Sequence, residues 1–98
     1  ILLLADVSTR VLNYWMETRD PAVFDCDLMK ANHHGIDGVP ESFMAAATPS
    51  VIVCTNNTNY DHNIELERLG ALYSGDGTVH IETDGADWYI WQDPNWID

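Results

Sequence analysis

Three short apolar runs, spread along the 98-residue chain, most restrict the folds open to it. They cover residues 1–6, 25–31 and 50–55, and each has the length and composition of a buried strand. Between the first two, Ser8 can cap a helix whose apolar residues share one face: Val11, Leu12, Trp15 and Met16. Strand, helix and strand in this order favour a right-handed crossover with parallel strands. The sequence therefore predicts an α/β fold.

The remainder of the chain adds two helices and a hairpin. Pro40 suits the first turn of a second helix, whose inward residues are expected to be Phe43, Met44 and Ala47. A short third helix is expected to end at Gly70. Residues 72–74 read as a brief strand, followed by a turn at residues 75–77. Residues 79–83 alternate in polarity, Asp84-Gly85 is a turn signal, and residues 88–91 read as a return strand. No linker or repeat divides the chain, so we expect residues 1–98 to form a single unit.

Polar side chains follow each of the three apolar runs. Asp6 ends the first, His33 and His34 follow the second, and His62 lies in the polar loop after the third. The carboxyl ends of parallel strands open into the crevice where such sheets bind ligands. Carboxylate and imidazole groups converging there suit a divalent metal. The plainer alternative is that the two adjacent histidines only form hydrogen bonds within a loop.

The blocks that carry these residues are Leu4-Ala5-Asp6, Asp27-Leu28-Met29-Lys30-Ala31-Asn32-His33-His34-Gly35, Pro49-Ser50-Val51-Ile52-Val53 and Tyr60-Asp61-His62-Asn63. In this order they resemble the C-terminal half of metallo-β-lactamase-fold hydrolases, in particular the branch of ComEC-type competence proteins and phosphorylcholine esterases. The resemblance covers residues 1 to about 85, and its most specific part is the His-His-Gly block. It implies the second half of an αββα sandwich, with a mixed sheet, flanking helices and a C-terminal hairpin.

The resemblance also implies roles for four residues. Asp6 would match the aspartate that bridges two metal ions, which would be zinc, with iron or manganese as alternatives. One of His33 and His34 would be a metal ligand, with preference for His34, and the other would lie beside the substrate. His62 would line the pocket.

The chain departs from the family pattern in several places. Ala5 stands where the family has Gly, Ile36 where it has Ser, and Asp61 and Asn63 where it has Gly and Pro. The family's His-x-His-x-Asp-His motif, which supplies most ligands, is not in this chain. We therefore expect residues 1–98 to be the C-terminal portion of a domain whose N-terminal half carries that motif, and the isolated chain to be inactive.

Charge narrows the range of partners. Sixteen acidic against four basic residues give a formal charge of −12, and the basic residues are scattered. Phosphate backbones repel such a surface, so nucleic acid is not expected as a partner. No run approaches the roughly 18 apolar residues of a membrane span. The expected partners are a small-molecule substrate, the missing half of the domain and, through exposed sheet, a second copy of the chain.

The two cysteines, the aromatic segment near the C-terminus and His80 are each expected to have a structural role or none. Cys26 and Cys54 fall inside predicted strands and have no Cys-x-x-Cys spacing, so we expect buried thiols and no zinc–thiolate site. The aromatic segment 88–91 could hold a quaternary ammonium group by cation–π attraction. A covering role over the edge of the sheet is the preferred explanation. His80, next to Glu82 in the alternation, is expected to be solvated.

The sequence thus favours part of a metal-dependent hydrolase that acts on a phosphodiester or an ester through a metal-activated water. The alternative is a non-catalytic half-domain that acts as a binding or assembly module.

Overall fold

The structure is a computed structural model that describes residues 1–56 and 64–94. Four strands form one parallel sheet in the order β1-β2-β3-β4. They are β1 (Leu2–Leu3), β2 (Leu28–Lys30), β3 (Val51–Cys54) and β4 (Leu72–Tyr73). Met29 pairs with Leu2 on one side and with Ile52 on the other, so these residues form a row across one face of the sheet. The predicted α/β class and parallel strands are confirmed.

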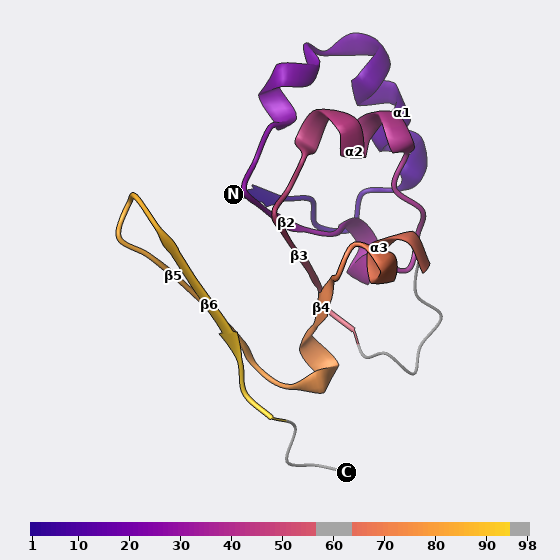
Figure 1. The fold of residues 1–98 in the computed structure, drawn as a ribbon. Helices are drawn as coiled ribbons and strands as arrows, with labels where there is room; N and C mark the ends of the chain where they lie inside the picture. The colour runs from indigo at the N-terminus through magenta and orange to yellow at the C-terminus, as the bar shows by residue number, and fades with distance from the viewer. Residues whose placement is uncertain (57–63, 95–98) are drawn as a thin grey trace.

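The helices lie together on one face of this sheet (Figure 1). They are α1 (Thr9–Thr18), α2 (Glu41–Ala47) and α3 (Ile64–Arg68). Three 3-10 turns lie in the connections: η1 (Pro21–Phe24) and η2 (Asn32–Gly35) before and after β2, and η3 (Ser74–Asp76) after β4. Strands that follow one another across a sheet, linked by right-handed crossovers, place every connecting helix on the same side. The opposite face is left for another layer.

Helix α1 begins and ends where the sequence indicates. The Ser8 hydroxyl accepts a hydrogen bond from the Val11 backbone N–H at 3.3 Å, which satisfies one unpaired donor of the first turn. Leu12 is fully buried, and its neighbours on the predicted face are half-buried: Val11, Trp15 and Met16. The next turn, η1, starts at Pro21, where the Asp20 carboxylate accepts from the Ala22 N–H at 3.1 Å. This turn directs Phe24 into the core.

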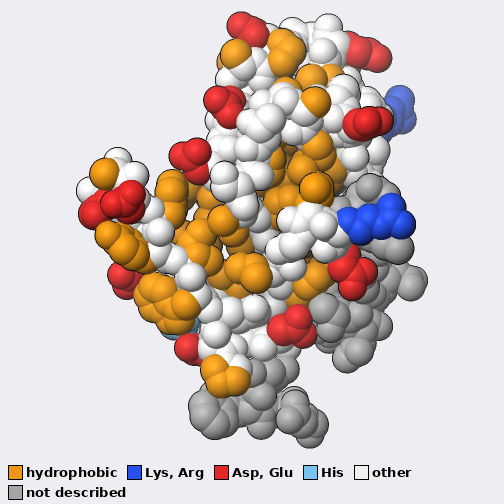
Figure 2. Space-filling model, in the orientation of Figure 1, with side chains coloured by type: hydrophobic (Ala, Val, Ile, Leu, Met, Phe, Trp, Pro, Cys, Tyr) orange, Lys and Arg blue, Asp and Glu red, His pale blue; other side chains and the backbone are white. Residues whose placement is uncertain are grey.

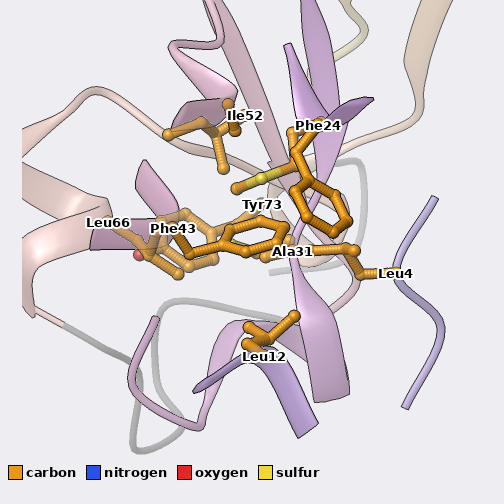
Figure 3. Close-up of a cluster of buried hydrophobic side chains, with 11 residues drawn as sticks. Leu4, Leu12, Phe24, Ala31, Phe43, Ile52, Leu66 and Tyr73 are labelled. Carbon is orange, nitrogen blue, oxygen red and sulfur yellow. The ribbon is translucent and has the colours of Figure 1, made fainter. Parts of the chain in front are cut away.

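Phe43 of α2 lies in the middle of the core (Figure 3). Its ring centroid is 5.0 Å from that of Phe24, which in turn stacks on Trp15 at 5.9 Å. Leu12 approaches from α1 and Leu66 from α3, so all three helices meet the sheet through one cluster. Offset or tilted ring contacts of this kind add to the stabilisation from burial. The core holds the sheet and the helices as one body.

The hairpin of β5 (Val79–Thr83) and β6 (Trp88–Gln92) lies on the other side of the sheet (Figure 1). Leu28 and Val53, which point away from the helices, are only 3% and 8% exposed, so this face is partly covered. The Gln92 side-chain N–H groups donate to the carbonyls of Tyr73 (2.6 Å) and Gly77 (2.9 Å), and these bonds fix the base of the hairpin. The described residues thus form three layers: helices, parallel sheet and hairpin.

Several details of the prediction are wrong. The expected mixed sheet is two separate sheets in the described part of the chain, one parallel and one antiparallel. The strands are shorter than the apolar runs, so Cys26 lies before β2 and not in it.

Other expectations agree with the structure. The brief strand expected at residues 72–74 is confirmed as β4, which pairs with β3 as the fourth strand of the main sheet. Both thiols are free, and none of the helices that the structure describes is long and apolar enough to cross a membrane.

Burial of the Cys54 thiol leads to a prediction about pH. Cys54 is fully buried, and desolvation raises its pKa to about 11. Because the folded-state pKa exceeds the unfolded one, the stabilisation is complete below about pH 9 and is lost as the pH rises to about 11. The free energy of unfolding, from urea denaturation, should fall between these pH values by about 1–2 kcal/mol more in the wild type than in Cys54→Ala. Cys26→Ala is the matched control. An equal pH dependence for the wild type and Cys54→Ala would contradict the assignment.

Candidate functional site

The loops after β1, β2 and β3 meet at one edge of the sheet through three hydrogen bonds. The His33 backbone N–H donates to the Ala5 carbonyl at 2.8 Å, and the Asn32 amide donates to the Val7 carbonyl at 2.9 Å. The Asn56 amide donates to the His34 carbonyl. These bonds tie the loop that carries Asp6 to the loop that carries the two histidines.

Asp6 and His34, the two predicted metal ligands, face each other. The Asp6 carboxylate Oδ1 lies 3.5 Å from His34 Nε2, and the two side chains are 70% and 48% exposed. As an ion pair, so exposed a contact contributes little to stability. As ligands, two donors at about 2.0–2.1 Å from one tetrahedral zinc would lie about 3.3 Å apart. The observed separation therefore fits a shared cation.

Thr55, at the end of β3, orients the His34 ring. Its carbonyl oxygen lies 3.2 Å and its hydroxyl oxygen 3.0 Å from His34 Nδ1. The carbonyl only accepts, whereas the hydroxyl can donate or accept. Donation from an Nδ1 proton to the carbonyl would leave the Nε2 lone pair of the neutral ring directed to Asp6. A backbone carbonyl behind the imidazole is the usual partner of a metal-ligating histidine. Thr55 was missed from the sequence because the bond depends on the tertiary fold.

His33, the predicted catalytic residue, has a different partner. Its Nδ1 lies 2.8 Å from Asp37 Oδ2, and both side chains are about 40% exposed, at 41% and 39%. The two histidine rings are 5.8 Å apart at 50°, so they do not stack on each other. Asp37 can therefore orient the His33 imidazole while leaving Nε2 open. The spacing of four residues was the available sequence signal for this pair.

The backbone at the site is strained at three residues that are not glycine. Ala5 has a φ of 50°, His33 of 45° and His34 of 58°. Left-handed angles cost non-glycine residues free energy, and such residues gather at functional sites. Lys30 offsets part of this cost, since its ammonium donates to the carbonyls of Ala31 (3.0 Å) and Ala5 (3.4 Å). The strain and its support lie at the same sheet edge as Asp6 and His34.

Gly35 completes the histidine turn because no other residue fits. Its φ is +77°, and a Cβ there would lie 2.5 Å from the Cys54 sulfur and 2.9 Å from the Cys54 Cβ. The turn can press onto β3 only with glycine at this position. The packing thus fixes where His34 sits relative to Thr55.

The structure shows no further candidate metal ligand beside Asp6 and His34 in the part of the chain that it describes. His62 lies outside the described residues. Within residues 1–56 and 64–94, no third His, Cys, Asp or Glu joins Asp6 and His34 into a metal-binding group. Asn32 is fully buried, and its Oδ1 accepts no hydrogen bond. An apolar pocket of about 360 Å³ lies at the opposite ends of the strands, between α2 and Leu69, so it does not belong to the histidine site.

Comparisons with known proteins give no match that would assign a function to the site. The chain matches no family model, no curated protein and no solved structure. The class of protein that the fold defines is thus a small α/β domain with a parallel sheet and a hairpin.

The Gly35 contact gives a stability prediction. Gly35→Ala should lower the free energy of unfolding by about 3 kcal/mol, because left-handed strain adds to overpacking against Cys54. Gly70→Ala is the matched control, since Gly70 has a φ of +80° and no atom within 4 Å of the added Cβ. It should lose only the strain, about 1–2 kcal/mol. Denaturant unfolding of both variants measures the difference, and equal losses would show that the Cys54 contact is unimportant.

Proposed function

We propose that this chain supplies one side of a divalent-metal site in a hydrolase that acts on a phosphodiester or an ester. One observation carries the proposal: His34 Nε2 lies 3.5 Å from the Asp6 carboxylate while Nδ1 is held by the Thr55 carbonyl. With the proton on Nδ1, that arrangement would direct an imidazole lone pair and a carboxylate oxygen to one point. Zinc binds both donor types, and iron or manganese would also accept them.

The backbone at Ala5 supports the resemblance behind this proposal. The hydrolases that the sequence resembles carry glycine at the corresponding position, just before the aspartate. Here Ala5 has a φ of 50°, a conformation that glycine adopts without strain. The same backbone turn that favours glycine also presents the Asp6 carboxylate.

The proposed roles follow from the contacts of each residue. Asp6 and His34 would hold the metal, which would lower the pKa of a coordinated water and polarise the scissile bond. His33, oriented by Asp37, can hold or donate a proton beside the substrate. His62, in the position that the resemblance gives it, would line the substrate pocket.

Asp6 and His34 are two ligands, whereas catalytic zinc has three protein ligands and an open position. In the proposed enzyme the other ligands would come from a complementary half of the domain that would carry His-x-His-x-Asp-His. The formal charge of −12 draws divalent cations to the site and disfavours long polyanions. A small phosphodiester or ester is therefore preferred over nucleic acid as the substrate.

The experiment is turnover of a chromogenic phosphodiester, with metal content, by the protein carrying both halves of the site. Asp6→Ala and His34→Ala should each lose metal and at least about 1000-fold of turnover, since metal activation supplies several kcal/mol. His33→Ala and Asp37→Asn should lower kcat about 10–100-fold with metal retained, and His62→Ala should likewise lose turnover but keep metal. His80→Ala is the control and should change neither quantity. Full activity and metal content in Asp6→Ala would overturn the proposal.

The second candidate is a non-catalytic module that assembles through exposed sheet. Ile1 and Leu3, at the edge strand β1, are 67% and 70% exposed, and an unpaired apolar edge favours association. Association with a second copy would be stronger at high salt, where the charge of each copy is screened. A self-associating protein whose complete form shows no turnover would favour this candidate.

A further inference from the structure

The face of the hairpin that points away from the sheet is rich in exposed aromatic rings. In the β5–β6 register His80 is opposite Trp91 and Glu82 is opposite Tyr89, so these four side chains share one face. We call it the hairpin outer face. Tyr89 is 51% and Trp91 44% exposed, whereas Trp88 on the opposite face is half-buried. The outer aromatics therefore do not form part of the core.

Contacts within the hairpin hold these side chains in place. The His80 ring stacks on Trp91 at 4.7 Å and 3°, and its Nε2 lies 2.7 Å from the Asp93 carboxylate. The Tyr89 hydroxyl donates to Asp84 at 3.3 Å. Side chains ordered in advance lose less conformational entropy when a partner binds.

The charge around the hairpin outer face has one sign. No Lys or Arg follows Arg68 in the sequence, whereas Glu82, Asp84, Asp87 and Asp93 lie on or beside the hairpin. Backbone N–H groups of Asp87 and Ala86 donate to the Asp84 carboxylate at 2.8 and 2.9 Å and hold its pKa below the ordinary value. Figure 2 shows acidic and hydrophobic side chains side by side on the hairpin at the left, with no Lys or Arg side chain among them.

We propose that the hairpin outer face binds an extended, arginine-containing segment of a partner polypeptide. The guanidinium group stacks on Trp and Tyr faces and donates to carboxylates, so it suits both features of this surface. Tyr and Trp are also the residues that most often carry binding energy at interfaces. A second copy of this chain is a poor occupant, because each copy has a formal charge of −12. The proposal is independent of the hydrolase activity.

The test is titration calorimetry of the 98-residue chain with a blocked peptide of alternating Gly and Arg that carries four arginines. Tyr89→Ala and Trp91→Leu should each weaken binding about threefold to fivefold, since each removes one cation–π contact. The same peptide with citrulline in place of arginine should not bind, because citrulline keeps the shape and loses the charge. The lysine peptide should bind more weakly than the arginine peptide.

Matched variants distinguish binding at the hairpin outer face from general attraction of the peptide to the negatively charged chain. Tyr14 is 58% exposed on α1, and Tyr14→Ala should leave the affinity unchanged. Glu82→Gln should weaken binding more than Glu17→Gln on α1, although both remove one charge. The proposal would be overturned if the hairpin variant and its α1 control had equal effects in either pair. It would also be overturned if the peptide did not bind, or if tetramethylammonium bound more tightly than the peptide. Amide spectra of Trp91→Leu and Tyr89→Ala confirm that the hairpin is intact before their affinities are compared.

Discussion

The turn at His33, His34 and Gly35 packs against Cys54, and the position of the candidate site depends on this contact. Gly35 approaches the Cys54 side chain more closely than any residue with a Cβ could, and the two preceding histidines have left-handed φ angles. The turn carries His34 to Thr55 on one side and to Asp6 on the other. The buried thiol of β3, which has no role in the proposed chemistry, thus fixes the distance between the two proposed ligands.

Local sequence signals predicted the elements that depend on local contacts. The Ser8 cap and the spacing of Leu12 and its neighbours determined α1, and alternation in polarity determined the hairpin. The sequence did not indicate where the strands end. Residues 25–27 alternate in burial as a strand would, but they do not pair with the sheet, and β2 begins only at Leu28. The brief strand at residues 72–74 was predicted, but not its pairing with β3, because that contact joins segments that are distant in sequence.

At the candidate site too, local sequence signals indicated some residues and missed those that act through tertiary contacts. Asp6 and the His33-His34 pair were identified because they follow apolar strands, and the preference for His34 came from the family resemblance. The structure brings Asp6 and His34 together. Their supporting partners, Thr55 and Lys30, act through backbone carbonyls and tertiary contacts that no motif records. For His80, alternation indicated a solvated side chain, and the side chain is 36% exposed. The sequence did not indicate that its ring also stacks on Trp91 and pairs with Asp93.

The most direct measurement is the protonation state of the His34 ring, from long-range ¹H–¹⁵N correlation spectra at about pH 8, where an ordinary imidazole is neutral. The proposed metal site requires the proton on Nδ1, toward Thr55, and a free Nε2 toward Asp6. Added Zn²⁺ should bind weakly, shift the His34 Nε2 resonance and leave His80 unchanged, and Asp6→Asn should abolish the response. A proton on Nε2, or a zinc response at His80 and Asp93 with none at His34, would contradict the assignment of Asp6 and His34 as metal ligands.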